Sequence, residues 1–532
     1  MIRFRFARRV FLTALCIFVC GVARADAAPQ RLTQNMAPRQ LFFTVWTSSP
    51  EECREYARLA KNLGFDGIDF VVNWDKFEPQ EGVFDWKYLD ECLAIFRAQN
   101  LKLSLSAMFW VNNLPWAQKL NMQQHENGET YFFEKLSPNP EDKRGPNLSY
   151  NDPRNLFLIE RALREFARHA NQKHGDAIVR FHARTSHYGE LEYTPLGQQV
   201  DFSPLAIGAF KNFLRREYSQ AGWGGLAAFN RNYKTSLANW NALDALPIGE
   251  VLARSTYDWQ RFRQHTVLGL SRVVARGLRA GAPDKMVALQ IGAVWDEAAA
   301  TARGAYDPYL LSRDVDILHT DDAPGWPHDF SLDLISSIAS DRLTAMELSA
   351  VTKSDGNDLV NGYLRQLRMG GESNLTFVNT ANWSPDQIEK WTPRLLSQYR
   401  PLFVEAVRHS EARRDRAILF NTADFLVRKQ GLDKLLLGTY QKLGDNGQKR
   451  VRFVTDSMIL QKPLLLRGLK SGLYLGAADS FSFDARIAQV LARANCALHV
   501  EGKSAPKFRD PFGNRLEGNV EATLLKNIVL SQ

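Results

Sequence analysis

Two glutamates stand at the ends of strand-like apolar segments. Glu190 follows AIVRFHARTSHYG (177–189), and Glu347 interrupts TAMELS (344–349). An unpaired carboxylate is costly inside an apolar strand, so Glu347 is expected to have a chemical role. Cleavage of a glycosidic bond needs two carboxyl groups, because one protonates the departing oxygen while the other attacks the sugar or activates water. The pair therefore predicts carboxylate chemistry on a sugar bond.

Each glutamate has a competing interpretation. Glu192 lies two residues after Glu190 in SHYGELEY, and in a continuing strand both side chains would point the same way. Glu190 is preferred because Gly189 permits a kink and a close substrate approach at the strand end. For Glu347 the alternative is a structural ion pair with Arg342 or another arginine.

Tryptophan and polar residues cluster at the same predicted strand ends. Tryptophan faces stack on pyranose rings, and Asn, His and carboxylate groups bind sugar hydroxyls, so this mouth suits a carbohydrate. A single tryptophan such as Trp46 or Trp74 would equally serve as a plug of the core. The residues predicted to bind substrate are Asn73, Trp110, His187, Trp295, His319, Asp321 and Trp383.

Metal and cofactor chemistry finds little support. The sequence has no HExxH motif, no G-x-S-x-G motif and no run of His and Asp at ligand spacing. His319, Asp321 and Asp322 form the one trio that would offer cation ligands, and a rim for sugar hydroxyls is favoured over it. No metal and no cofactor are therefore expected.

The elements that must position these residues alternate as strand and helix from about residue 40. Eight strands in βα order predict an α/β fold, a (β/α)8 TIM barrel over 38–408 with a helical insertion at about 203–282. Such a barrel gathers its βα loops, and with them the candidate residues, at the C-terminal ends of its strands. The predicted strands are 41–46, 67–74, 101–106, 177–190, 285–295, 315–322, 342–351 and 374–383.

A second α/β rhythm begins after residue 410. Strands are predicted at 416–421, 451–456, 473–476 and 496–500, which gives a smaller Rossmann-like or flavodoxin-like accessory domain over 412–532. It has no G-x-G-x-x-G or Walker loop, so no nucleotide site is expected there. The last thirty residues carry no predicted element.

The N-terminus has the pattern of a cleaved signal peptide over 1–27. Residues 1–25 contain five arginines and no acidic residue around the apolar run 10–22, and small-residue cleavage sites follow that run. Arg8 and Arg9 begin RRVFL, which fits the twin-arginine motif as well as an ordinary secretory start. The expected location is the periplasm or the medium, with no membrane insertion after cleavage, because no second apolar stretch is long enough.

The charge balance and the cysteines limit which partners and which disulfide bonds are expected. The formal charge of +9 includes the five N-terminal arginines, and without them 62 basic residues face 58 acidic ones. That balance argues against a nucleic-acid partner or an anionic membrane surface. Outside 1–27 the cysteines are Cys53, Cys92 and Cys496, which predicts buried thiols, with a Cys53–Cys92 bridge as the alternative.

The segment NWDKFEPQEGVFDWKYLDECLAI (73–95) resembles the second-strand region of clan A glycoside hydrolases, and in particular family 42 β-galactosidases. The resemblance implies a retaining mechanism, with Glu190 as acid/base and Glu347 as nucleophile, and a second domain that makes oligomer contacts. Glu78 is expected to be structural. The matching residues are Trp74, Glu78, Pro79, Gly82, Phe84, Asp85, Leu89 and Asp90.

One departure from that family keeps other readings open. Clan A acid/base residues usually follow an asparagine, and here Gly189 stands before Glu190. The GELEY segment instead resembles the catalytic-acid region of inverting β-amylases. His187 or Asn73 would then replace the asparagine. The alternatives are an inverting β-amylase-like hydrolase and a non-catalytic barrel that binds an exopolysaccharide; the sugar and the exo or endo mode stay open.

Overall fold

The computed structural model describes residues 40–531 with internal gaps. The predicted signal peptide and the site residues His187, Trp295 and Trp383 lie outside the described residues. The gaps are 48, 133–144, 187–188, 194–199, 221–222, 293–302, 305–306, 323–327, 350–374, 380–389, 391–392, 394–396, 398–416, 428–430, 445–450, 470–471 and 517.

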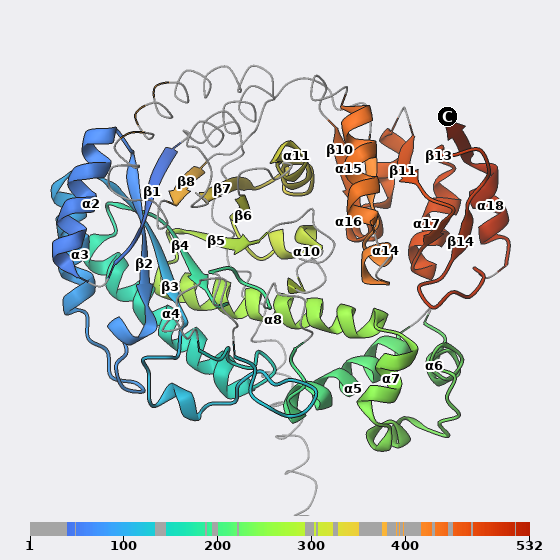
Figure 1. The fold of residues 1–532 in the computed structure, drawn as a ribbon, viewed down its shortest axis with the longest axis horizontal. Helices are drawn as coiled ribbons and strands as arrows, with labels where there is room; N and C mark the ends of the chain where they lie inside the picture. The colour runs from blue at the N-terminus through green and yellow to red at the C-terminus, as the bar shows by residue number, and fades with distance from the viewer. Residues whose placement is uncertain are drawn as a thin grey trace, which may run out of the picture.

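Eight parallel strands form one closed barrel in the order of the sequence, β1 to β8 (Figure 1). This confirms the predicted (β/α)8 fold. The strands are β1 Gln40–Trp46, β2 Gly67–Asn73, β3 Lys102–Met108, β4 Ile178–Arg184, β5 Met286–Ile291, β6 Ile317–Asp322, β7 Leu343–Ser349 and β8 Leu375–Asn379.

Amphipathic helices cover the outside of the barrel. The first, α2, begins at the Ser49 cap, whose side chain accepts from Glu52 N, and ends at the left-handed Gly64. Cys53 and Cys92 are buried free thiols, as predicted, so the alternative bridge is not formed. The described covering helices are α2 Pro50–Leu63, α3 Lys87–Ala98, α4 Pro153–His174, α8 Tyr257–Gly281, α10 Pro308–Ser312 and α11 His328–Ile338.

The segment between β4 and β5 is helical, as predicted. Its first helices, α5 (Pro204–Ser219), α6 (Gly225–Tyr233) and α7 (Ile248–Arg254), pack around a separate apolar cluster that includes Trp259 of α8. The long α8 then lies along α4 (Figure 1). A Cβ at Gly281 would sit 2.3 Å from Arg164 O, so the missing side chain permits this close packing. α8 therefore belongs to the barrel wall, although it begins in the insertion.

The side chains inside the barrel change from apolar to polar along the barrel axis. The lower part is apolar and includes the stacked rings of Phe42 and Phe377, 5.1 Å apart, with Ile317 and Leu343. Toward the C-terminal strand ends, inward positions become polar. Both faces of a barrel strand are enclosed, so these polar groups must satisfy one another or a ligand.

A second parallel sheet with strand order β10-β9-β11-β13-β15 forms the accessory domain, with a two-stranded β12–β14 sheet beside it. It packs on α11: Tyr440 Oη donates to Asp333 Oδ2 at 3.0 Å, and Phe453 N donates to Ser337 Oγ at 3.0 Å. The strands are β9 Ala417–Phe420, β10 Arg452–Thr455, β11 Leu473–Ala477, β12 Ser480–Ser482, β13 Leu498–Glu501, β14 Lys507–Arg509 and β15 Ile528–Ser531.

The helices of this domain are α14 Thr422–Leu426, α15 Leu432–Leu443, α16 Asp456–Gln461, α17 Ala485–Ala494 and α18 Val520–Lys526. The sequence did not predict β14, α18 or β15, which lie within the last thirty residues. Within the described part of the chain, no helix combines the length and the apolar character that crossing a bilayer requires.

Candidate active site

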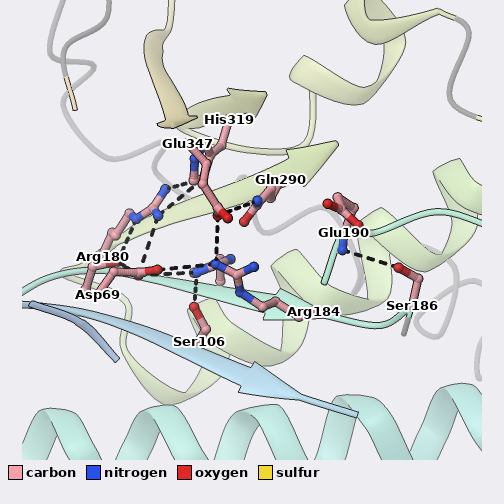
Figure 2. Close-up of polar contacts among 11 residues, drawn as sticks. Asp69, Ser106, Arg180, Arg184, Ser186, Glu190, Gln290, His319 and Glu347 are labelled. Atoms are coloured by element: carbon pink, nitrogen blue, oxygen red, sulfur yellow. Dashed lines mark hydrogen bonds and ion pairs between the residues drawn. The ribbon is translucent and has the colours of Figure 1, made fainter. Parts of the chain in front are cut away.

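A charged network fills the barrel above the apolar floor (Figure 2). Arg180 on β4 is fully buried; its Nε donates to Ser104 Oγ at 2.8 Å, and its Nη2 lies 3.7 Å from Asp69 Oδ1. Ser104 Oγ donates to the same Asp69 oxygen at 2.6 Å. Burial alone would raise the pKa of Asp69, but the hydrogen bond from His182 and the arginine charges hold it well below its usual range.

His319 lies within this network, not at the rim. It is fully buried, and its Nδ1 lies 3.2 Å from Arg180 Nη1. Because a guanidinium only donates, Nδ1 must accept. Burial and the charge of Arg180 hold the pKa of His319 well below 6.5, so the ring is neutral. His319 thus lies deeper than the rim, with its Nε2 unpaired among the described residues, and its contact with a sugar stays a prediction.

Glu347 on β7 projects into the barrel where this network ends. Its side chain is 3% exposed, and its Oε2 accepts from Arg184 Nη2 at 3.1 Å and from Gln290 Nε2 at 2.7 Å. Figure 2 shows Glu347 held between these donors from β4 and β5. Arg184 Nη2 also contacts Asp69 Oδ2 at 3.3 Å. The predicted ion-pair alternative thus holds in part, since an arginine does pair with Glu347, but from β4 and not from Arg342.

Glu190 lies beyond the end of its strand. β4 ends at Arg184, so the segment 177–190 that was predicted to carry the strand runs six residues past its C-terminal end. The chain turns instead: Ser186 N donates to Glu190 O at 3.0 Å, and Leu191 N donates to Gln290 O on β5 at 2.9 Å. These bonds fix the segment against β5, and Glu190 therefore stands beside the strand that also carries a Glu347 partner.

The rival glutamates occupy different environments. Glu192 is fully buried, and its carboxylate accepts from Arg303 Nη1 at 2.7 Å and from Gly292 N at 3.2 Å. Glu190 is 4% exposed, and its Oε2 has no hydrogen-bond partner among the described residues. Glu192 is therefore tied into the wall, while Glu190 keeps an oxygen for another molecule.

The pKa values of Glu190 and Glu192 are both raised. Burial raises the pKa of Glu190 above 4.5, and the negative charge of Glu347 raises it further, against the opposing charges of Arg303 and Arg184. Burial likewise raises the pKa of Glu192 to about 8. A proton on Glu190 beside an arginine-paired Glu347 is the charge state that an acid and a nucleophile need.

Three candidate residues gather over β1, β2 and β3. Trp46 Nε1 donates to Asn73 Oδ1 at 3.5 Å, and the rings of Trp46 and Trp110 lie 5.2 Å apart. Trp46 also faces the guanidinium of Arg184, whose Cζ lies 5.9 Å from the ring centroid. Asn73 and Trp110 are thus brought together with a group that contacts Glu347.

Asp321 approaches the same mouth from β6. It pairs in register with Glu347 on β7, so the two side chains share a face of the sheet. Its charge also acts on Arg303. Among the residues that the structure describes, no group of three or more His, Cys, Asp or Glu side chains is placed to hold a metal ion.

Glu78 is structural, as expected. It is fully buried; its Oε2 accepts from Trp74 Nε1 at 2.8 Å, and its Oε1 accepts from Gly82 N at 2.7 Å and pairs with Arg161. Trp74 is fully buried beside Phe109, 4.8 Å away, so it packs the core and does not line the mouth.

Replacing Glu78 with alanine should destabilise the fold. Because Trp74, Gly82 and Arg161 would lose one acceptor group, Glu78→Ala is expected to cost about 3–5 kcal/mol of unfolding free energy. Urea unfolding measures this. Glu81→Ala is the matched control, since Glu81 forms an exposed pair with Arg154 and should cost under about 1 kcal/mol. Equal losses in both variants would contradict the structural role.

The glycine before Glu190 has a physical explanation. Gly189 has φ +109°, a conformation that other residues adopt only with strain, and a Cβ there would lie 2.8 Å from Arg184 Nη1. The guanidinium of Arg184 thus fills the space that an asparagine side chain at 189 would need. Glycine at 189, where the family has asparagine, therefore leaves the room that the guanidinium of Arg184 occupies.

Restoring asparagine should therefore harm this protein. Gly189→Asn is expected to lower kcat/KM at least about 100-fold, because it displaces Arg184 and strains the backbone by about 1–3 kcal/mol. Gly208→Ala in α5 is the control, since a Cβ there meets nothing within 4 Å and should leave kcat/KM unchanged. An active, equally stable Gly189→Asn would show that the close approach is unimportant.

Sequence reasoning missed the network that holds the two glutamates. Arg180, His182 and Arg184 alternate along β4, and Ser104 and Ser106 alternate along β3. Period-two polar residues in a strand with both faces enclosed point into the barrel. That pattern was readable in the sequence, whereas Arg303 lies in a connection and carried no such signal.

Comparison with known proteins supports the resemblance seen in the sequence. The model of glycoside hydrolase family 42, described as β-galactosidase, matches residues 41–108. A curated relative, β-galactosidase BgaA of a Thermus species, is 23% identical over 278 residues. The match covers 50% of this chain and 38% of that protein, so it spans well under two thirds of the relative.

Solved structures extend the likeness in fold. A β-galactosidase from the psychrophilic Marinomonas ef1 aligns with TM-score 0.65 and 14% identity, over 91% of this chain and 78% of that one. The catalytic domain of a Paenibacillus polymyxa β-amylase aligns with TM-score 0.51 and 14% identity, over 69% and 98%. The resemblance to clan A glycoside hydrolases, and to family 42 β-galactosidases among them, is therefore confirmed in the sequence of the first three strands and in the fold of most of the chain.

Proposed function

We propose that this protein is an exported β-glycoside hydrolase that acts with retention of configuration. One observation carries the proposal: two buried glutamates, from β7 and from the segment after β4, meet at one barrel mouth in different electrostatic surroundings. Glu347 is paired with Arg184, while Glu190 has a raised pKa and an oxygen without a partner among the described residues. A sequence and fold likeness to β-galactosidases supports the same chemistry.

The first step of the proposed reaction assigns one role to each glutamate. A Glu347 oxygen attacks the anomeric carbon as Glu190 gives its proton to the departing glycosidic oxygen, so one C–O bond forms and another breaks. Arg184 and Gln290 fix Glu347 toward the sugar, since both donate to its Oε2. Holding the nucleophile in one orientation lowers the entropic part of the barrier.

The second step reverses these roles. Glu190, now ionised, takes a proton from water, whose oxygen attacks the anomeric carbon and releases Glu347. Arg184 and Arg303 both act electrostatically on Glu190, which favours its ionised form between the two steps. Deglycosylation thus returns both carboxyl groups to their starting states.

The charges around the site favour a neutral sugar. Arg180 is near Asp69, Arg184 pairs with Glu347, and Arg303 pairs with Glu192. Each arginine already has a carboxylate partner, so a substrate carboxylate would compete with Asp69 or with Glu347 itself. The proposed substrate is therefore an uncharged β-linked pyranoside, held against Trp46 and Trp110.

A panel of aryl β-glycosides, followed by NMR of the first-formed anomer, tests this function. We expect at least one neutral β-glycoside to be cleaved and the β-anomer to appear first. First appearance of the α-anomer would replace the proposal with the inverting, β-amylase-like mechanism. Tight glycan binding with no cleavage of aryl glycosides or bacterial exopolysaccharides would indicate a binding barrel and overturn the enzymatic proposal.

The pH dependence of kcat/KM should report Glu190. Because the first step needs the protonated form, activity falls as pH rises through the pKa of Glu190, and the raised pKa moves this alkaline limb upward from 4.5. We expect Glu190→Gln to remove that limb. A wild-type limb that persists unchanged in Glu190→Gln would assign the proton to another group.

Export and assembly complete the proposal. The arginine-rich start and the apolar run 10–22 support cleavage near residue 27. N-terminal sequencing of the protein from the cell-envelope fraction tests this cleavage. The double substitution Arg8→Lys and Arg9→Lys would block export only if the twin-arginine route is used.

We also propose an oligomer that forms through the accessory domain. Its sheet ends in the edge strand β15, where Val529 and Leu530 are 41% and 44% exposed. Light scattering measures the oligomeric state.

A further inference from the structure

Arg184 uses only part of its hydrogen-bonding capacity. Its guanidinium is 2% exposed and offers five N–H groups. Nη2 donates to Asp69 and Glu347, whereas Nε is buried without a partner among the described residues. Nη1 makes no hydrogen bond to a described residue, but of the two atoms only Nε is also fully buried. A buried donor of a charged group is costly to leave unsatisfied, so the buried Nε points to a ligand.

The position of these donors limits what the ligand is. Nη1 lies against Gly189, next to Glu190 in the chain, and Nη2 contacts Glu347. The charge of Glu190 also acts on Arg184. Arg184 therefore stands between the two carboxyl groups, both of which act at the anomeric carbon. Its free donors must face a substituent next to that carbon.

Besides the departing glycosidic oxygen, which takes its proton from Glu190, two oxygens of a pyranoside lie next to the anomeric carbon: the ring oxygen and the C2 hydroxyl. The ring oxygen gains positive charge in the oxocarbenium-like transition state, so a guanidinium beside it would oppose the reaction. The C2 hydroxyl accepts hydrogen bonds without that penalty. An arginine at this place is compatible with catalysis only if it binds the C2 hydroxyl.

We propose that Arg184 contacts the substrate, and that its Nε and Nη1 donate to the C2 hydroxyl of the sugar that Glu347 attacks. This inference rests on the proposed function. It makes Arg184 both a support for Glu347 and a specificity-determining residue, with Asp69 as its anchor from β2. It also gives Arg184 the hydroxyl-binding task that His187 or Asn73 was expected to take.

A cycle of enzyme and substrate changes separates contact from support. We would measure kcat/KM of wild type and Arg184→Met on the aryl β-glycoside that wild type cleaves best and on its 2-deoxy analogue. The ratio of kcat/KM on the parent glycoside to kcat/KM on the 2-deoxy analogue is then compared between the two enzymes, because the difference in intrinsic reactivity of the substrates cancels in that comparison. If Arg184 binds the C2 hydroxyl, this ratio of parent to 2-deoxy analogue should be at least about 10-fold lower in Arg184→Met than in wild type.

The opposing result is equally clear. If Arg184 acts only through Glu347, both substrates lose the same factor and the ratio stays constant, which would overturn the inference while leaving the enzymatic proposal intact. Arg184→Lys keeps the charge and serves if Arg184→Met fails to fold; it should also lower the ratio, because it lacks the planar pair of donors. Absence of cleavage by wild type would overturn the proposed function and this inference together.

Discussion

Glu347→Gln should lose at least about 10⁴-fold in kcat while keeping its fold, because glutamine is isosteric with glutamate but cannot form the covalent sugar ester. The amide oxygen can still accept from Arg184 and Gln290, which hold Glu347 Oε2 at 3.1 and 2.7 Å. The melting temperature should therefore change little. Glu91→Gln is the matched control, since Glu91 makes an exposed pair with Arg54 and should retain full activity.

Chemical rescue with azide tests whether the loss of turnover comes from the loss of the nucleophile. In Glu347→Gly the removed carboxylate leaves room for a small anion at the anomeric carbon, and azide should restore turnover and give a glycosyl azide of α configuration. Substantial activity of Glu347→Gln without azide would remove Glu347 from the mechanism. Recovery with a β-configured azide would instead place this residue in the acid/base role.

Glu190→Gln should lose about 10²–10⁴-fold on substrates with poor leaving groups, which need a proton to depart. An activated leaving group such as a dinitrophenolate needs no proton, so its release should be nearly normal and the glycosyl-enzyme should accumulate. A burst of phenolate followed by slow turnover measures this. The argument rests on the buried carboxyl of Glu190, whose raised pKa favours the protonated form that the first step needs.

Glu192→Gln is the matched control for that prediction. Glu192 is bound to Arg303 and Gly292 N, so its loss should reduce stability and leave the dependence on leaving group as in wild type. If Glu192→Gln shows the leaving-group effect and Glu190→Gln does not, the assignment of the two glutamates must be exchanged.

The sequence predicted the barrel because each strand and each helix carries its own signal. The Ser49 cap and Gly64 bound α2, and the period-two and period-3.6 patterns mark the elements between them. Closure of β1 onto β8 followed from counting eight βα units. The C-terminal end of β4 was predicted wrongly, because HARTSHYGE continues the strand-like pattern although the strand ends at Arg184.

The site was only partly predictable. Glu347 was marked by a charge inside an apolar segment, and Glu190 by its position after the fourth strand. The contact of His319 with sugar stays a prediction; its depth had no sequence signal, since the fully buried ring faces Arg180 across the barrel. The role of Arg184 depends on its approach to Gly189 and on a shared contact with Asp69, and contacts between distant strands have no local sequence signal.

Covalent trapping tests the central claim most directly. An aryl glycoside with fluorine at C2 forms the glycosyl-enzyme and slows its hydrolysis, so the labelled chain can be digested and analysed by mass spectrometry. The proposed mechanism predicts one fluoroglycosyl group per chain, on Glu347 in the TAMELS segment, and no label in Glu347→Gln. A label on another residue, or its absence from an enzyme that turns over the parent glycoside, would contradict the assignment of Glu347 as nucleophile.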